Sequence, residues 1–489
     1  MSTVNVNIKN AGKSYPMEVD LDEPGLTFKL QVYSLTNIPP ERQKVLLKGG
    51  QLKDDSDLHN FHLKNGQNIM VLGTPEVITQ EIESKRPKDK IQFVEDLNPN
   101  DLNVQHSQVP SGLINLGNTC YLNSSLQSLF KIKELKDTLQ TLPAGSVTAS
   151  EQKLMVDLKD LFAKMKVKKQ DVTPLNFLTT MRQVFPQFSE RGEQGFYKQQ
   201  DAEEAFSQIL GAIVRKFPQL ENFFKVEFKT TTKCLETEEE PSYGIEDSLK
   251  LSCHISIHTN FLKDGLIGNL KEKIEKNNEL LGKNCEYEIS RKITKLPKYL
   301  VVHFVRFFWK RDTGKKSKIL RKVQFPFELD VTDLVDDSIR DDMIKVRDSL
   351  YKVEKANFDE NRSFKKTKLS QDLTTREQYN KQKEQLAELQ KKWLSNYQKV
   401  LPADFDPSKG EAPSPLYELG SVIAHQGSSA DSGHYQAFVK DDDDLNGDTW
   451  FKFDDNKVSN VSREKIESLA GGGEGDSALI LIYKAVGLP

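Results

Sequence analysis

The chain has 489 residues, of which 37% are hydrophobic and 29% are charged, and its formal net charge is −3. This length predicts one small and one large domain rather than a single one. No basic stripe favours nucleic-acid binding, no apolar run reaches the roughly 18 residues of a membrane span, and no secretory signal opens the chain. Only four cysteines are present, so we expect reduced thiols in the cytosol or nucleus.

The first 75 residues have the pattern of a small α+β domain. Residues 4–8 and 17–21 alternate between apolar and polar side chains as strands do, and residues 26–34 have the apolar spacing of a short helix. Residues 45–47 and 69–72 predict two further strands. This order resembles ubiquitin over its whole length, and the resemblance implies a β-grasp fold. Another small α+β domain is the alternative.

The end of this domain differs from that of ubiquitin in one informative way. Where ubiquitin ends in a diglycine, this chain continues as Gly73-Thr74-Pro75, so the resemblance implies a docking module that is not conjugated. By position, Leu46, Met70 and Leu72 match the exposed apolar patch of ubiquitin and are expected to bind a partner. The alternative is that these three side chains belong to the core.

The rest of the chain predicts a linker and a large domain. Residues 76–108 are polar, charged and proline-containing, as expected for a flexible linker that lets the domains move independently. Residues 109–485 form the large domain. Within it, the charged segment 331–412 carries two apolar stripes at steps of three and four residues, which predict an inserted helical hairpin. We interpret these stripes as packing surfaces, not as a cofactor site.

Cys120 lies where a helix is expected to begin. The turn- and cap-forming residues 115–119 precede it, and apolar side chains follow at helical spacing within residues 122–130. A thiol at a helix N-terminus is exposed to unpaired backbone N–H groups and the positive end of the helix dipole, which favour the thiolate. Cys120 is therefore a candidate nucleophile.

A cysteine hydrolase also needs a base and a group that orients the base. His434 follows Gly433 and precedes an expected strand at 435–439, and His425 is its main competitor. A hairpin from this strand to residues 450–458 would place Asp454 beside the imidazole, where its carboxylate would accept the Nδ1–H. Asp455 is the alternative orienting group.

Four segments in this order resemble the ubiquitin-specific protease family, the papain-like cysteine deubiquitinases. They are NLGNTCYLNSSLQ, YKQQDAEEAF, LPKYLVVHFVRF and the pair GHY and FDDNKV, within residues 111–485. The resemblance implies an α+β domain with fingers, palm and thumb. It implies Cys120 as the nucleophile, His434 as general base and then acid, Asp454 as the orienting carboxylate, and Asn115 as an oxyanion donor beside the backbone N–H of Cys120.

The resemblance also implies the substrate, an isopeptide bond after the C-terminal glycine of ubiquitin. Asp201 and Glu203 are expected to line the channel for the basic ubiquitin tail, although a solvated helix face is an equal alternative for both. Tyr435, which follows His434, is expected in the same substrate-binding region. Residues 427–433 are small and adjoin His434, so they are a candidate gate.

The N-terminal module and the charged insertion resemble the proteasome-associated type within this family. That resemblance implies docking on the proteasome regulatory particle, presence in cytoplasm and nucleus, and a monomer outside the proteasome. A noncatalytic scaffold that binds ubiquitin and the proteasome is the alternative, and the intact Cys, His, Asp and Asn set argues against it.

No metal or other cofactor is expected. Many family members hold zinc with two Cys-x-x-Cys pairs, but Cys234, Cys253 and Cys285 show no such spacing. Residues 253–258 alternate as a strand does and are interpreted as one.

Overall fold

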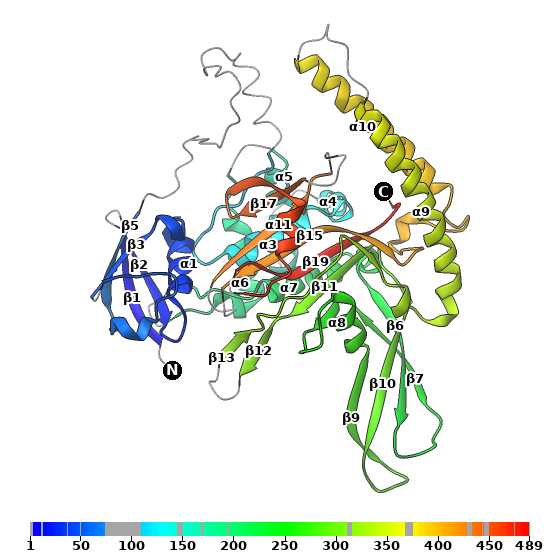
Figure 1. Cartoon of the computed structure of the whole chain (residues 1–489), viewed down its shortest axis with the longest axis horizontal. Helices are drawn as coiled ribbons and strands as arrows, with labels where there is room; N and C mark the ends of the chain where they lie inside the picture. Colours follow the sequence, from blue (N-terminus) through cyan, green and yellow to red (C-terminus); the bar gives the residue numbers. More distant parts are fainter. Residues whose placement is uncertain are drawn as a thin grey trace.

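The structure is a computed structural model with an N-terminal domain and a large domain (Figure 1). It describes residues 3–73 apart from 11–12, 37 and 49, and residues 109–488 apart from 144–149, 168–170, 193–194, 311–314, 367–374, 428–432, 443, 445–448 and 474. The expected linker at 76–108 therefore lies outside the described residues. No helix in the described ranges is long and apolar enough to cross a membrane.

The N-terminal domain has one helix on a five-stranded sheet of order β2-β1-β5-β3-β4. The apolar side of helix α1 packs on the sheet, and the core contains Phe28 and Val32 of the helix and Val45 and Val71 of the strands. The expected β-grasp order of elements is confirmed. The elements are β1 (Thr3–Asn10), β2 (Lys13–Asp20), α1 (Gly25–Thr36), β3 (Lys44–Leu47), β4 (Gly50–Gln51) and β5 (Gln67–Leu72).

The large domain begins with a group of helices that forms the thumb. Their apolar faces share a core with parts of the central sheet, and this core includes Leu126 of α3 and Ile209 of α7. The helices are α3 (Cys120–Phe130), α4 (Lys133–Gln140), α5 (Ser150–Met165), α6 (Leu175–Val184) and α7 (Ala202–Lys216).

The palm is an eight-stranded sheet of order β18-β17-β16-β15-β19-β11-β8, in which β14 also pairs with β15. Helix α3 packs on β16, so the sheet supports the N-terminus of that helix. The elements are β8 (Leu251–His254), α8 (Leu262–Asn269), β11 (Tyr299–Val305), β14 (Glu328–Asp330), β15 (Leu416–Gln426), β16 (His434–Lys440), β17 (Thr449–Asp454), β18 (Lys457–Ser462), α11 (Arg463–Ser468) and β19 (Ser477–Ala485).

The fingers are a four-stranded antiparallel sheet of order β7-β6-β10-β9, which projects from the body in Figure 1. Its strands are β6 (Val226–Cys234), β7 (Ser242–Ser248), β9 (Lys271–Asn278) and β10 (Lys283–Lys295). A separate hairpin contains β12 (Phe307–Lys310) and β13 (Lys315–Lys318). The predicted α+β class with fingers, palm and thumb is confirmed.

Two long helices form the expected insertion, α9 (Asp337–Lys366) and α10 (Thr375–Gln398). They lie side by side and extend away from the body (Figure 1), and Glu360 of α9 accepts a hydrogen bond from the indole of Trp393 at 3.1 Å. Leu350 of the first helix is fully buried against the domain. The predicted helical hairpin is therefore present.

The predicted strand at 253–258 is wrong beyond its first two residues. Strand β8 ends at His254, because Ser256 and Thr259 form a hydrogen-bonded turn that leads into α8. Alternation of apolar and polar residues did not reveal this turn, in which the side-chain hydroxyls bond the backbone instead of facing solvent.

Candidate active site

Helix α3 begins at Cys120, as the sequence predicts, and the thiol lies at its N-terminus. Leu122, Leu126 and Leu129 are fully buried, so their apolar face fixes the helix against the palm and α7. The preceding turn uses two residues with positive φ, Gly117 at 95° and Asn118 at 53°. These turn residues bring the chain sharply into the helix and leave the first N–H groups of α3 beside Cys120.

His434 and Asp454 meet on adjacent strands. His434 is the first residue of β16 and Asp454 the last residue of β17, and Nε2 of the imidazole donates to Oδ1 of Asp454 at 2.6 Å. Gln436 donates to the other oxygen, Oδ2, at 2.9 Å. Both carboxylate oxygens therefore have partners that hold the group toward the imidazole.

The expectation that Asp454 accepts the Nδ1–H is wrong, since Nε2 makes this bond. The two nitrogens lie on different sides of the ring, so only one can face the carboxylate. The other nitrogen, Nδ1, is therefore the one left to exchange a proton with Cys120, which raises the pKa of the imidazole. The order of residues along the chain does not encode this ring orientation.

The electrostatics of the pair favour an imidazolium. Burial lowers the pKa of His434, but the Asp454 carboxylate and the Cys120 sulfur more than offset this and hold that pKa well above its usual value. Burial raises the pKa of Asp454, and the attraction of His434 overrides it, so this pKa lies well below its ordinary range. A cation beside a thiol stabilises the thiolate, which is the nucleophilic form.

An Asp454→Asn substitution tests this coupling. The neutral amide removes the attraction that raises the pKa of His434 while the burial that lowers it stays, so the imidazolium is lost at a lower pH. We expect the alkaline limb of the pH profile of kcat/KM, which reports loss of the imidazolium as general acid, to move to lower pH, with a fall in kcat of about 10²-fold. An Asp404→Asn variant, at an exposed carboxylate, is the control. An unchanged alkaline limb would contradict the assignment.

Asp455 has a different role from the one considered for it. Its Oδ2 lies 4.0 Å from Nε2 of His434, whereas it accepts from Nδ2 of Asn115 at 2.9 Å. Its Oδ1 accepts from Nδ2 of Asn123 on α3 at 2.7 Å. Burial and the neighbouring Asp454 raise the pKa of this carboxyl above its usual value. Asp455 therefore ties the turn before Cys120 and the helix after it to the palm.

Asn115 is held at both ends of its amide. Its Oδ1 accepts from the backbone N–H of Gly117 at 2.9 Å, and its Nδ2 donates to Asp455. The bonds to Asp455 and the contribution of Asn123 were missed from the sequence. The closely spaced asparagines of NLGNTCYLN were the available signal, since buried amides need hydrogen-bond partners.

Close backbone approach holds the same turn in place. A Cβ on Gly112 would lie 2.3 Å from the carbonyl oxygen of Asn456, a distance that no side chain tolerates. The N–H of Leu113 donates to the carbonyl of Asp455 at 2.9 Å. The segment before Cys120 therefore runs directly along the turn that carries Asp454 and Asp455.

His425 and Tyr435 pack against each other instead of joining the pair. Their ring centroids are 4.6 Å apart, and Phe307 contacts His425 edge-on at 5.3 Å. His425 and Tyr435 are both almost fully buried. The competitor for the base is thus part of the packing behind His434. A substrate contact of Tyr435 stays a prediction.

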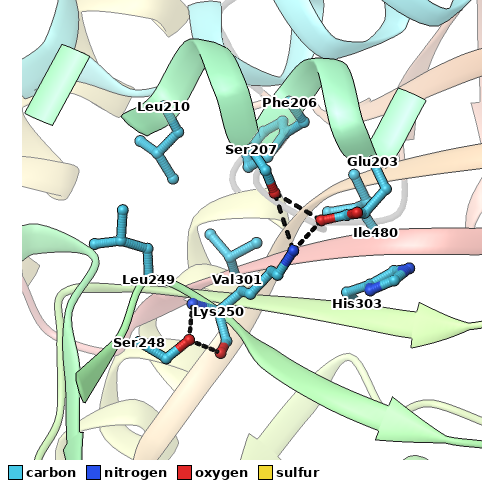
Figure 2. A pocket seen from close by; sticks show the side chains of 10 residues that line it. All are labelled: Glu203, Phe206, Ser207, Leu210, Ser248, Leu249, Lys250, Val301, His303 and Ile480. Atoms are coloured by element: carbon cyan, nitrogen blue, oxygen red, sulfur yellow. Dashed lines mark hydrogen bonds and ion pairs between the residues drawn. The ribbon is translucent and has the colours of Figure 1, made fainter. Parts of the chain in front are cut away.

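Asp201 and Glu203 lie at the start of α7 and already have partners. Asp201 caps the helix by accepting from the N–H of Glu203 at 2.9 Å. Glu203 forms an ion pair with Lys250 and accepts from Ser207 at 2.6 Å, and Figure 2 shows this trio at the edge of a 210 Å³ cavity between α7 and the palm. His303 lies nearby in the same cavity. This arrangement does not test whether Asp201 and Glu203 line the channel for the ubiquitin tail or form a solvated helix face.

The apolar patch of the N-terminal domain is exposed. Leu46, Met70 and Leu72 are 48%, 56% and 48% exposed, and Leu46 lies opposite Met70 across β3 and β5. The alternative that these side chains belong to the core is wrong. Their partner-binding role stays a prediction.

The three cysteines outside the site do not share one location. Cys234 and Cys285 lie in the fingers, and Cys253 lies in the palm core, with its thiol 3.7 Å from the carbonyl of Leu262. Within the described ranges, three potential ligand groups cluster only at His434, Asp454 and Asp455, which bond one another or Asn115 and Asn123. The expected absence of zinc remains a prediction. Residues 428–432 of the candidate gate lie outside the described residues.

Comparisons with known proteins show the family of the chain. Residues 111–483 match the family model described as ubiquitin carboxyl-terminal hydrolase, and residues 6–76 match that of the ubiquitin family. The chain is 39% identical to ubiquitin carboxyl-terminal hydrolase 6 of Schizosaccharomyces pombe, over 99% of both chains. It is 35% identical to ubiquitin carboxyl-terminal hydrolase 7 of Arabidopsis thaliana, over 96% of both. It is 30% identical to ubiquitin carboxyl-terminal hydrolase 14 of Caenorhabditis elegans, over 98% of this chain and 93% of the relative.

Proposed function

This chain belongs to the ubiquitin carboxyl-terminal hydrolase family, and from that premise we propose that Cys120, His434 and Asp454 are its catalytic residues. The family consists of cysteine isopeptidases, and the protein is a deubiquitinase. The observation that carries the residue assignment is the imidazole of His434, whose Nε2 donates to Asp454 at 2.6 Å and whose pKa is raised by Asp454 and by the neighbouring Cys120. The same three roles recur in other cysteine and serine hydrolases.

The proposed reaction begins with attack of the Cys120 thiolate on the carbonyl carbon after the last glycine of ubiquitin. The carbonyl π electrons move to oxygen, and the resulting oxyanion accepts from the backbone N–H of Cys120 and from Asn115. One hydrogen of the Asn115 amide bonds Asp455, and we assign the second to the oxyanion. Asp455 thus fixes the amide in position without contacting the substrate.

Collapse of the oxyanion then breaks the C–N bond. The imidazolium of His434 gives its proton to the departing lysine amine and becomes a neutral base. It next takes a proton from water, which attacks the thioester and releases the ubiquitin carboxylate and the thiolate. Asp454 stays ionised throughout and stabilises the imidazolium each time it forms.

The tail of ubiquitin is expected to pass the start of α7. Asp201 and Glu203 support this part of the proposal through charge, since the tail is basic. Lys250 offsets the charge of Glu203, so Asp201 is the stronger candidate contact. Tyr435, beside His434, would then pack under the substrate.

We further propose that the protein docks on the proteasome regulatory particle. Its proposed location is the cytoplasm and nucleus, and we propose that it is a monomer when it is not bound to the proteasome. The support for docking is the exposed patch of Leu46, Met70 and Leu72 on a domain that matches the ubiquitin family. Apolar patches of this kind mark interaction sites.

A Leu46→Arg variant tests the docking. Arginine at this exposed position places a charge in the apolar contact without disturbing the core, so binding to purified proteasomes should fall by about tenfold or more. Co-migration on native gels measures the loss, and Asn60→Arg, at another exposed position of the domain, is the matched control. Equal binding by the two variants would contradict docking through this patch.

Hydrolysis of a fluorogenic ubiquitin substrate, with and without purified proteasome, tests the activity. We expect cleavage that increases when proteasome is present. A wild-type chain that cleaves nothing under either condition would favour the noncatalytic scaffold.

A further inference from the structure

Helix α1 of the N-terminal domain lies directly on the catalytic histidine. The ring of Tyr33 contacts the imidazole of His434 edge-on, with centroids 5.3 Å apart, and Oγ of Ser34 lies 3.4 Å from its Nδ1. Tyr33 and Ser34 are 8% and 5% exposed. Neither belongs to the hydrophobic core of its own domain, so contact with the large domain accounts for their burial.

Two further contacts join the two domains, the first of them at α1. Nζ of Lys457, the first residue of β18, donates to the hydroxyl of Tyr33 at 2.8 Å and lies 4.7 Å from the centre of its ring. On β2, a carboxylate oxygen of Glu18 lies 3.4 Å from where a Cβ on Gly192 would be. In Figure 1 the α1 side of the N-terminal domain faces the large domain. The expected independence of the two domains therefore does not describe this arrangement.

We propose that the α1 surface of the N-terminal domain is a binding surface for the catalytic centre of its own chain, and that the C-terminal tail of ubiquitin competes with it. This inference rests on the proposed function, since it concerns access to the same site. The competition follows because Ser34 covers Nδ1 of His434. Since Nε2 bonds Asp454, Nδ1 is the nitrogen left to pass its proton to the leaving amine, and a substrate cannot occupy that space while Ser34 does.

Burial of the reacting groups agrees with a covered centre. Cys120 is 0% exposed and His434 is 1% exposed, so the scissile carbonyl cannot reach the sulfur in this arrangement. Displacement of α1 opens the approach to Nδ1. The fraction of molecules in the open arrangement then scales the observed rate of hydrolysis.

The covering surface is separate from the exposed patch of Leu46, Met70 and Leu72. Phe28 and Val32 of α1 pack with Val45 and Val71 on one face of the sheet. Leu46 and Met70 alternate with those strand residues and are exposed on the other face. One surface can therefore be altered without the other, and the patch stays open while α1 covers the site.

A Tyr33→Lys substitution in the full-length chain tests the proposal. It removes the ring that contacts His434 and places a second cation beside Lys457, while the core of the N-terminal domain is untouched. Without proteasome, we expect reaction with a ubiquitin probe bearing a C-terminal electrophile to quicken about tenfold. Ser34→Arg, which forces a larger side chain toward Nδ1, should do the same. Asn60→Lys is the matched control and should leave the rate unchanged.

Small-angle X-ray scattering of the same proteins measures the contact itself. The radius of gyration should rise in both α1 variants and stay at the wild-type value in Asn60→Lys. A larger radius without faster probe reaction would overturn the covering role, and no change in either measurement would overturn the contact.

Iodoacetamide separates failure of this inference from failure of the proposed function. If wild type and both α1 variants react equally fast with the ubiquitin probe, the covering role is wrong and the hydrolase stands. If Cys120 is alkylated by iodoacetamide in all three but none reacts with the ubiquitin probe, the proposed function itself fails.

Discussion

Replacing Cys120 with alanine is expected to lower kcat for a fluorogenic ubiquitin substrate by about 10⁵–10⁶-fold. The sulfur is the only atom at this site that forms a bond to the substrate in the proposed reaction, so no neighbouring group replaces it. Alanine fits the same space at the start of α3, and the buried leucines that hold the helix are untouched. Loss of activity should therefore come without loss of the fold.

Cys285→Ser is the matched control. This cysteine is buried in the fingers, on β10, and the substitution should leave kcat near the wild-type value. Circular dichroism and binding of unmodified ubiquitin check that both variants are folded. A Cys120→Ala protein that still hydrolyses substrate, or a Cys285→Ser protein that is inactive while folded, would contradict the choice of nucleophile.

An Asn115→Ala variant should lose about 10²–10³-fold in kcat, equivalent to about 3–4 kcal/mol of transition-state stabilisation. KM should change little, because the oxyanion forms only after substrate has bound. Steady-state kinetics on the fluorogenic substrate separates the two parameters. A rise in KM with unchanged kcat would show that Asn115 binds the ground state instead.

Asp455→Ala should cause a loss of similar size through the same amide, because Nδ2 of Asn115 loses its anchor at 2.9 Å. Adding Asn115→Ala to the Asp455→Ala variant should then cause little further loss, since Asp455→Ala has already released the Asn115 amide along with that of Asn123. Asp404→Ala, at an exposed carboxylate outside the site, serves as the control. Multiplicative losses in the double variant would mean that the two residues act independently.

The local pattern of residues was sufficient to predict most of the helices and strands. The alternating residues of β1 and β2, the amphipathic spacing of α9 and the turn residues before Cys120 each act within a few positions of one another. For the same reason the hairpin from β16 to β17 could be anticipated, and with it the meeting of His434 and Asp454.

Apart from the local turn at Ser256 and Thr259, the features that the sequence did not reveal depend on residues far apart in the chain. Asn115 and Asp455 are 340 positions apart, and Ser34 and His434 are 400 apart. Nothing in the spacing of such residues indicates that they touch, because the contact depends on how finished domains pack. The choice between Nδ1 and Nε2 likewise depends on which side of the ring the thiol approaches.

The role of Cys120 as nucleophile is tested most directly by reaction of the full-length chain with ubiquitin whose C-terminal carboxylate is replaced by an electrophile, followed by peptide mapping. We expect one covalent ubiquitin per chain, attached to the sulfur of Cys120, and no adduct with Cys120→Ala. Attachment at another cysteine, or no adduct with wild type even when proteasome is present, would contradict it.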